Sequence, residues 1–317
     1  MQEYSFIRLL PGRNTVTREG YFMLLNMSSL LKAANENNFA IPAFNTPTQM
    51  IMRGAIEAAE ETGTPIIIEV HPDELEFARS SFITMLVEEA RKSTVPVCIH
   101  MDHGSTLSQI MTAIQCGYTS VMIDASSQPF EENVAICREV VRLAHMVNVS
   151  VEGELGTIGT TSVSQDVTST TEIHYTEPEE AAEFVEKTGV DTLAIAIGTC
   201  HGLYPKGMIP TLQLDRLRAI KKRLPIPLVL HGGSANKDEE IAEASRCGIN
   251  KINISSDIKD PFYQKCREML QDPYIREPGE IYPPCIEVMK DVMRHKFDLL
   301  GCTGKADLYD YSILRPM

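Results

Sequence analysis

The feature that most constrains the fold is a repeat of short apolar segments that alternate with amphipathic helical segments from Met27 onward. The apolar segments are nearly continuous, as in parallel strands that are covered on both faces. Gly63 and Gly248 each follow the last turn of a predicted helix, where glycine is a common stop signal. The predicted strands cover residues 39–45, 65–70, 95–101, 119–124, 149–155, 192–199, 227–232 and 249–255.

Eight strand–helix units of this size predict an α/β fold, a closed (β/α)8 or TIM barrel, as a single domain over residues 23–317. An open doubly wound sheet is the alternative. That fold would favour a glycine-rich dinucleotide fingerprint after the first strand, and "FNTPTQ" does not provide one. Residues 1–22 lack this periodicity and are interpreted either as an N-terminal extension or as sequence upstream of a start at Met23 or Met27. An additional helix is expected near the C-terminus, in "CIEVMKDVMRHKFDLLG", outside the barrel or against a partner.

Composition narrows the classes of partner. The formal net charge of −14 argues against nucleic acid or an anionic membrane as the main partner, but leaves small phosphorylated substrates open. The eight cysteines form no C-x-x-C pair, which is typical of reduced intracellular thiols. No apolar run approaches 18 residues and no signal peptide opens the chain, so a cytoplasmic protein is predicted.

Three histidines occupy equivalent positions. His103, His201 and His231 each follow an apolar strand and each is followed by glycine. Since catalytic residues of such barrels lie at the C-terminal ends of the strands, the three imidazoles are expected to converge on one mouth. Three histidines with an open fourth position are typical of catalytic Zn²⁺. His100 is one or two positions too deep and is interpreted as a supporting residue, and Cys200 as either a soft ligand or a packing residue.

Carboxylates fall at the same level of the barrel: Asp102, Asp124, Glu152 and Glu154 all lie at strand ends. Beside a dication, such an acid can shuttle a proton or orient a ligand. Asp124 can alternatively cap the next helix. Glu152 and Glu154 share one face of their strand, and only one of them need reach the metal.

Two loops predict a phosphate site. "HGGSAN" follows the seventh predicted strand and "NISSD" the eighth, and each leads into a helix. Phosphate commonly binds at these two loops of a barrel. Backbone N–H groups at Gly232 and Gly233 and the hydroxyl groups of Ser234, Ser255 and Ser256 are the expected donors, with ordinary helix capping as the alternative.

The segments "FAIPAFN", "VPVCIHMDHG", "VMIDASS", "VEGELG", "DTLAIAIGTCHGLY", "VLHGGSA", "INKINISSD" and "KFDLLGCTGKAD" together resemble the class II zinc-dependent ketose-bisphosphate aldolases, the family of the fructose- and tagatose-1,6-bisphosphate enzymes. The resemblance covers about residues 24–307 and implies reversible cleavage of a ketose phosphate to dihydroxyacetone phosphate and an aldehyde. It implies that His103, His201 and His231 hold Zn²⁺ and that Asp102 is the catalytic acid/base.

Asp124 and Glu154 match acids that bind a second or displaced metal in some members. The dihydroxyacetone-phosphate half would contact Gly202, Gly232, Gly233, Ser234, Asn253, Ile254, Ser255 and Ser256. A monovalent cation near the phosphate and a homodimer or homotetramer are further family properties.

The chain departs from the family pattern at two loops. The segment after the fifth strand carries serine and threonine where acids are expected, so Asp166 or Glu172 is the candidate replacement for the family's loop glutamate. After the second strand, "EVHPDELEF" places His71 at the aldehyde end as a specificity candidate. Asn45 is retained. Two other functions stay open: a sugar-phosphate-binding accessory subunit without turnover, and a metal-dependent hydrolase on the same barrel.

Overall fold

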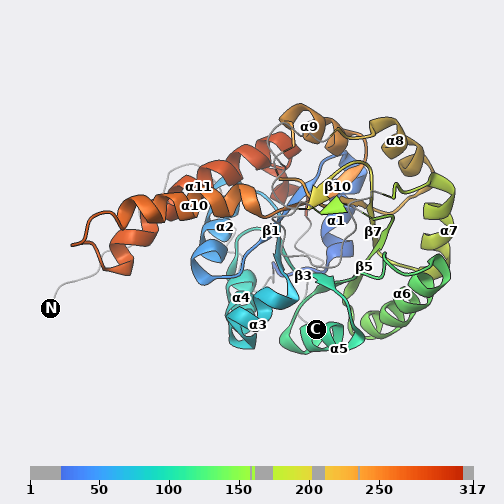
Figure 1. The fold of residues 1–317 in the computed structure, drawn as a ribbon, viewed down its shortest axis with the longest axis horizontal. Helices are drawn as coiled ribbons and strands as arrows, with labels where there is room; N and C mark the ends of the chain where they lie inside the picture. Colours follow the sequence, from blue (N-terminus) through green and yellow to red (C-terminus); the bar gives the residue numbers. More distant parts are fainter. Residues whose placement is uncertain (1–22, 158, 161–173, 202–210, 235, 310–317) are drawn as a thin grey trace.

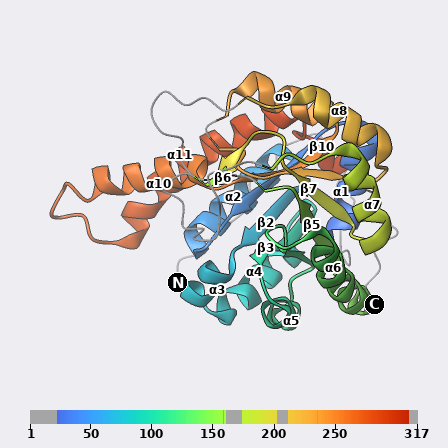
Figure 2. The same cartoon turned by 45° about the vertical axis from the view of Figure 1, so that its right-hand side comes forward.

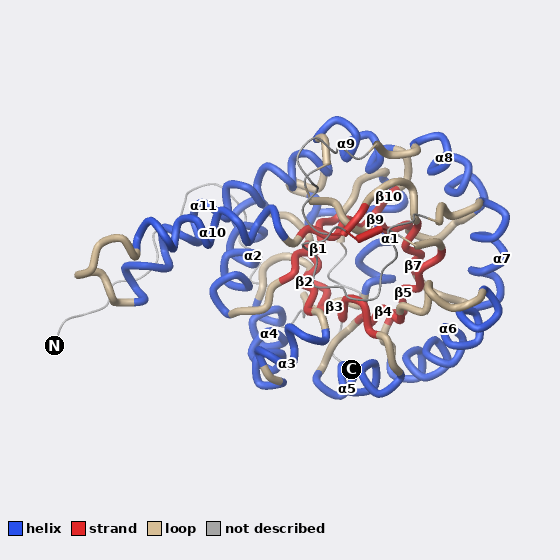
Figure 3. The backbone as a smooth tube through the Cα atoms, viewed as in Figure 1, coloured by secondary structure: helices blue, strands red, loops and turns tan. Residues whose placement is uncertain are grey.

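Eight parallel strands close into a barrel in the order β1-β10-β9-β7-β5-β4-β3-β2, so the predicted (β/α)8 fold is confirmed. The structure is a computed structural model that describes residues 23–157, 159–160, 174–201, 211–234 and 236–309. Figures 1 and 3 look down the barrel, with the strands as an inner ring and helices outside. The strands are β1 (Ile41–Asn45), β2 (Ile66–Val70), β3 (Val97–Gly104), β4 (Ser120–Ile123), β5 (Ser150–Leu155), β7 (Thr192–Ile195), β9 (Leu228–Leu230) and β10 (Ile249–Ile254). The two-residue strands β6 (Gly159–Thr160) and β8 (Cys200–His201) pair outside this ring.

The helices form because apolar residues recur at helical spacing and cover the outer face of the strands. Local signals set their ends. Thr106 and Gln109 form a capping box at the start of α5, and Gly63 ends α2 in the left-handed region. The outer helices are α2 (Gln49–Thr62), α4 (Ser80–Lys92), α5 (Leu107–Cys116), α6 (Phe130–Ala144), α7 (Pro178–Thr188), α8 (Leu214–Arg223) and α9 (Asp238–Arg246), with α3 (Pro72–Ala78) following β2 and short 3-10 helices at His145–Val147 and Lys305–Leu308.

Helix α1 (Met27–Asn37) lies across the N-terminal end of the barrel (Figure 3). The chain around it bonds to the beginnings of several strands: the Leu25 N–H to the Val97 carbonyl, the Thr119 hydroxyl to the Leu25 carbonyl, and the Ser28 N–H to Ser150 Oγ at 3.0 Å. This end of the barrel is therefore covered. The opposite end, where the polar side chains gather, holds the site.

The C-terminal part of α10 (Ser256–Met269) and the N-terminal part of α11 (Pro278–Leu300) extend away from the barrel as an arm, whereas the rest of α11 packs against α2 and β1 (Figures 1 and 2). The C-terminal part of α11 is the predicted additional helix, but α11 begins seven residues earlier than the "CIEVMK" pattern indicated, with three prolines in its first turns. It lies against α2 at Gly54, where the Met289 and Ile286 side chains occupy the space beside the glycine. No helix within the described ranges is long and apolar enough to cross a membrane.

Candidate active site

The end of β3 carries Asp102 and His103 into the barrel mouth. His103 has a φ of 47°, a left-handed backbone conformation that costs a non-glycine residue of order 1–2 kcal/mol. The next residue, Gly104, has no room for a side chain, since a Cβ would lie 2.8 Å from Ile110 Cδ1 and 2.9 Å from the Met122 carbonyl oxygen. Strained backbone of this kind is typical of functional sites, where surrounding packing holds it in place.

Two amides orient the Asp102 carboxylate. Asn45 Nδ2 at the end of β1 donates to Asp102 Oδ2, and Asn253 Nδ2 in β10 donates to Oδ1, both at 3.0 Å. Burial alone would raise the pKa of Asp102, but the positive charge at His103 and Lys251 holds that pKa well below its ordinary value. The carboxylate is thus fixed in position and ionised. The resemblance implies that Asn45 and Asn253 contact the substrate; in the structure both amides donate to Asp102.

His231 follows β9 and is enclosed by the two β5 glutamates. Its Nε2 lies 2.8 Å from Glu152 Oε1 and its Nδ1 3.1 Å from Glu154 Oε2. Burial disfavours the imidazolium, but the two carboxylates outweigh burial and raise the pKa of His231. The period-two spacing of Glu152 and Glu154 therefore places one carboxylate on each ring nitrogen.

Asp124, just after β4, contacts His103, the other predicted metal ligand whose side chain the structure describes. Its Oδ2 lies 2.9 Å from His103 Nδ1, and its Oδ1 accepts bonds from the Ser126 N–H and hydroxyl. Asp124 is not the N-cap of α6, which begins at Phe130. The pKa of Asp124 falls well below its usual range: burial opposes this, and the His103 contact outweighs it.

The donor atoms fit a dication. One ligand atom from each of Asp102, His103 and His231 lies within 4.8 Å of the others, and the same holds for His103, Asp124 and Glu154. The His103 and His231 ring centroids are 4.8 Å apart. Imidazole nitrogens and carboxylate oxygens are the ligands of catalytic zinc sites. The third predicted ligand, His201, lies in β8, but its side chain is outside the described part of the structure.

The predicted phosphate loops lie side by side after β9 and β10. The Gly233 N–H bonds to the Asn253 carbonyl at 3.1 Å, and Ser234 Oγ accepts from the Ser255 N–H at 3.3 Å. Gly232 has a φ of 65°, and a Cβ on Gly233 would clash with Ile252 Cγ2. Ser256 begins α10. The Ile254 side chain is buried in the core, so only its backbone faces the loop. Gly202, Asp166 and Glu172 lie outside the described residues.

His71 lies near the metal candidates at the entrance of α3, with its ring centroid 6.4 Å from that of His103. Its Nδ1 accepts from the Asp73 N–H, and Glu74 Oε2 accepts from the His71 N–H, which together form a capping box. Lys259 of α10 lies 2.6 Å from Glu74 Oε1. The divergent "EVHPDELEF" segment is therefore tied to the helix that follows β10.

Sequence reasoning missed Glu69 and Lys251, which are fully buried inside the barrel. Lys251 Nζ lies 2.9 Å from Glu152 Oε2 and 3.5 Å from Glu69 Oε2. Burial and the nearby Asp102 raise the pKa of Glu69 well above its ordinary value. The available signal was one ionisable residue within each apolar strand, in "IIIEV" and "INKINI".

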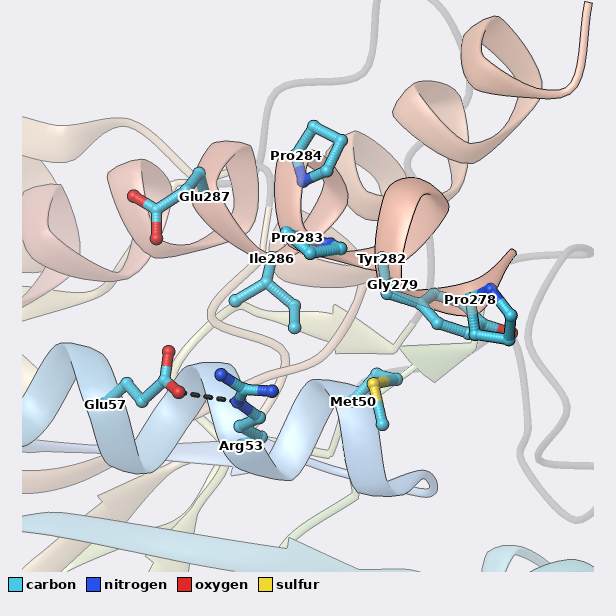
Figure 4. A pocket seen from close by; sticks show the side chains of 10 residues that line it. All are labelled: Met50, Arg53, Glu57, Pro278, Gly279, Tyr282, Pro283, Pro284, Ile286 and Glu287. Carbon is cyan, nitrogen blue, oxygen red and sulfur yellow. Dashed lines mark hydrogen bonds and ion pairs between the residues drawn. The ribbon is translucent and has the colours of Figure 1, made fainter. Parts of the chain in front are cut away.

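A cavity of about 450 Å³ lies outside the barrel, between α2 and the root of the arm (Figure 4). Met50, Arg53, Tyr282 and Pro283 are among its lining residues, and Arg53 pairs with Glu57 at 2.6 Å. None of the described site residues lines it.

Comparisons with known proteins agree on one family. The family described as "Fructose-bisphosphate aldolase class-II" matches residues 25–305. The D-tagatose-1,6-bisphosphate aldolase subunit GatY of Klebsiella oxytoca is 36% identical over 287 residues, which are 90% of this chain and 99% of that protein. The crystal structure of the YdjI aldolase from Escherichia coli K12 superposes with a TM-score of 0.79 at 34% identity, over 89% of this chain and 99% of that one. A putative fructose-1,6-bisphosphate aldolase from Coccidioides immitis gives a TM-score of 0.80 at 28% identity, over 88% and 97%.

Proposed function

The chain belongs to the class II fructose-bisphosphate aldolase family, and from this premise we propose how its own residues divide the work of aldol cleavage. As a member, it is a zinc-dependent aldolase: a carbon–carbon lyase that reversibly cleaves a ketose phosphate to dihydroxyacetone phosphate and an aldehyde. The roles of individual residues and the identity of the sugar form the proposal.

His103, His201 and His231 hold the zinc ion. The support is the convergence of His103 and His231 with Asp102, together with the position of His201 at the end of β8. When bound, zinc supplies a Lewis acid that stabilises negative charge developing on the substrate oxygens. Asp124 and Glu154 orient the two described histidines through their 2.9 and 3.1 Å contacts and offer oxygens to a displaced or second ion.

Asp102 moves the proton of the hydroxyl group that becomes the aldehyde. Its orientation between the Asn45 and Asn253 amides, beside His103, is the single observation that carries this role. A general base must be ionised before it accepts a proton, and the lowered pKa of Asp102 keeps it so at neutral pH. In the direction of synthesis the same carboxyl group returns the proton.

The dihydroxyacetone-phosphate half binds the loops after β9 and β10, through Gly202, Gly232, Gly233, Ser234 and the 253–256 segment, with a monovalent cation beside the phosphate. The support is that the two loops are adjacent, joined by the bonds from the Gly233 N–H to the Asn253 carbonyl and from the Ser255 N–H to Ser234 Oγ, and that α10 begins beside them at Ser256. Asp166 or Glu172 removes the proton from dihydroxyacetone phosphate in the synthetic direction. His71 contacts the aldehyde half, which it can reach because it lies next to His103.

Three broader features complete the proposal. The enzyme is a homodimer or homotetramer, which sedimentation velocity tests directly. It is cytoplasmic, in keeping with free thiols at the seven described cysteines. Potassium ions increase its activity relative to a bulky organic cation at equal ionic strength, as a cation site beside the phosphate requires.

The central experiment measures release of dihydroxyacetone phosphate by the zinc-loaded enzyme from a panel of ketose mono- and bisphosphates. D-tagatose 1,6-bisphosphate comes first because a 36% identical relative carries that name, and fructose 1,6-bisphosphate comes second. The Asp102→Asn variant should bind zinc but lose cleavage. Zinc binding without release from any member of the panel would overturn the proposed reaction, and full activity of Asp102→Asn would overturn the role of Asp102.

A further inference from the structure

We propose that Lys251 positions the metal ligand His231 through Glu152; this inference rests on the metal assignment proposed above. The three side chains come from three strands or strand ends, β10, β5 and β9, and all are essentially excluded from solvent. Lys251 Nζ lies 2.9 and 3.2 Å from the two oxygens of Glu152. Glu152 Oε1 lies 2.8 Å from His231 Nε2. The contacts form a continuous chain from lysine to imidazole.

Lys251 determines where the Glu152 carboxylate points. A buried carboxylate needs a cation or several hydrogen bonds to remain ionised in place. Glu152 receives its cation from Lys251, and its Oε2 lies 3.5 Å from His100 Nε2, whose ring is held by Ser120 Oγ at 2.9 Å. With Oε2 occupied on that side, Oε1 is directed toward His231. Removing the ammonium group would leave the carboxylate without its cation and able to turn.

The direction of Glu152 Oε1 fixes which His231 nitrogen is available to metal. A neutral imidazole that donates from Nε2 to a carboxylate carries its lone pair on Nδ1. Nδ1 is the nitrogen on the side of Glu154, within the cluster of donor atoms at the mouth. A carboxylate on the second nitrogen of a metal-bound histidine orients the ring and makes it a stronger ligand. Lys251 in turn holds the carboxylate that orients the His231 ring.

Glu69 keeps Lys251 itself in place. Its Oε2 lies 3.5 Å from Lys251 Nζ, on β2, so the lysine is held between β2 and β5 across the barrel interior. Burial lowers the pKa of Lys251, but the surrounding carboxyl groups, with Glu152 foremost, outweigh it and raise that pKa above its ordinary value. The ammonium group is therefore charged, and its position is set by two strands.

The test compares the zinc affinity of Lys251→Met with that of the wild type, by competition with a chromogenic chelator. Loss of a supporting contact of this kind weakens metal binding about 10–100-fold, and this is the expected result. The visible spectrum of the Co²⁺-substituted enzyme should also change, because it reports ligand geometry rather than stability. Zinc affinity within about twofold of the wild type, with an unchanged Co²⁺ spectrum, would overturn the inference, since a lost supporting contact costs more than that.

The matched control is Lys290→Met. Lys290 is another buried lysine, with a side chain only 4% exposed, and it contacts Glu61 at 2.5 Å and Glu287 at 3.0 Å on the outer wall. This variant removes a similarly buried lysine that lies outside the barrel and contacts neither His103 nor His231. Its zinc affinity and Co²⁺ spectrum should therefore match those of the wild type. An equal loss of affinity in both variants would assign the effect to general destabilisation and overturn the positioning role.

A double variant, Lys251→Met with Glu152→Gln, covers the case in which the single variant does not fold. It leaves no unpaired charge at position 152, and neutral replacement of both partners of a buried pair is commonly tolerated. The neutral amide oxygen is a weaker acceptor than a carboxylate and no longer has a lysine to orient it, so zinc affinity should still fall about tenfold. Wild-type affinity in the double variant would overturn the inference. The premise is tested separately by His231→Ala, since zinc bound by the wild type and retained in that variant would exclude His231 as a ligand.

Discussion

Two buried lysines, Lys251 and Lys290, each lie among glutamates, but in different surroundings. Lys251 and its partners Glu69 and Glu152 have no solvent exposure at all. Lys290 is nearly as buried, yet its partners Glu61 and Glu287 are half exposed on α2 and α11. The outer cluster joins two helices. The inner cluster contacts the predicted metal ligand His231 through Glu152. Its ion pair therefore bears on metal binding as well as on packing.

Burial of the lysine alone does not decide the role of an ion pair. Solvent at the Glu61 and Glu287 carboxylates screens their attraction to Lys290, so the outer cluster contributes little beyond joining the helices. In the barrel interior the same attraction is unscreened and the cost of desolvation is high. The proposed positioning of His231 is the role that distinguishes the interior cluster from the outer one.

The largest expected effect comes from removing the residue at which the inner cluster meets the metal site. His231→Ala should lose zinc and all measurable aldolase activity, because one imidazole ligand and the contact to Glu152 disappear together. Bound zinc is measured by atomic emission after dialysis, and activity by release of dihydroxyacetone phosphate. Full occupancy and turnover in this variant would contradict the assignment of His231 to the metal.

Asp102→Asn separates metal binding from proton transfer within the inner region. The amide keeps the size of the side chain but cannot accept the substrate proton, so kcat should fall about 10²–10⁴-fold. Zinc content should stay near that of the wild type if the three histidines are the ligands. Kinetics and metal analysis on the same preparation check both points, and a drop in zinc that parallels the drop in kcat would instead make Asp102 a ligand.

Stability separates the two lysines directly. Lys251→Met leaves Glu152 buried without its cation and should lower the free energy of unfolding by about 3–5 kcal/mol. Lys290→Met leaves carboxylates that water can solvate and should cost about 1 kcal/mol. Urea unfolding of both variants in the presence of a chelator gives the two values. Equal losses would remove the distinction between the inner and outer clusters.

The smallest effect concerns pH. Burial, reinforced by the Lys251 charge, lowers the pKa of His100 to about 3. In the unfolded chain a histidine takes up a proton near pH 6.5, so between about pH 6.5 and 3 the unfolded state binds one proton more than the folded state. Acidification through this window therefore destabilises the fold, by about 1.4 kcal/mol per pH unit from this residue. His100→Gln should reduce that slope by about one proton between roughly pH 4 and 6, in urea titrations of metal-free protein; an unchanged slope would show that His100 is charged in the fold.

The fold was predictable because its strands are nearly continuous apolar runs, and because glycine marks the ends of several helices. His103 and His231 could be placed for the same reason, since the barrel fixes which end of a strand faces the site. Strand ends were less accurate: β3 continues through Gly104, and β7 ends at Ile195 rather than residue 199. Both differences lie at the mouth, where bulges and loops replace regular pairing.

Other features depend on contacts between distant strands, which periodicity does not report. Lys251 and Glu152 are 99 residues apart and meet only across the barrel interior. The same is true of Asn253 and Asp102, which are 151 residues apart. A lone charged residue in an apolar strand indicates a buried partner but does not identify it. The arm of α10 and α11 was also only partly predicted, because prolines at 278, 283 and 284 obscure the start of the helix.

The described metal candidates come from strands that must be assembled before they can meet. His103 ends β3 and His231 follows β9, and the ring between them closes only when β10 pairs with β1. An ion that binds both histidines therefore binds the closed barrel and not the open chain, and it adds RT ln(1 + [Zn²⁺]/Kd) to the stability of the closed form. Zinc occupancy therefore reports that the barrel has closed. A partly synthesised chain that lacks β9 and β10 contains at most part of the site. The complete chain binds its cofactor only when these last strands close the barrel.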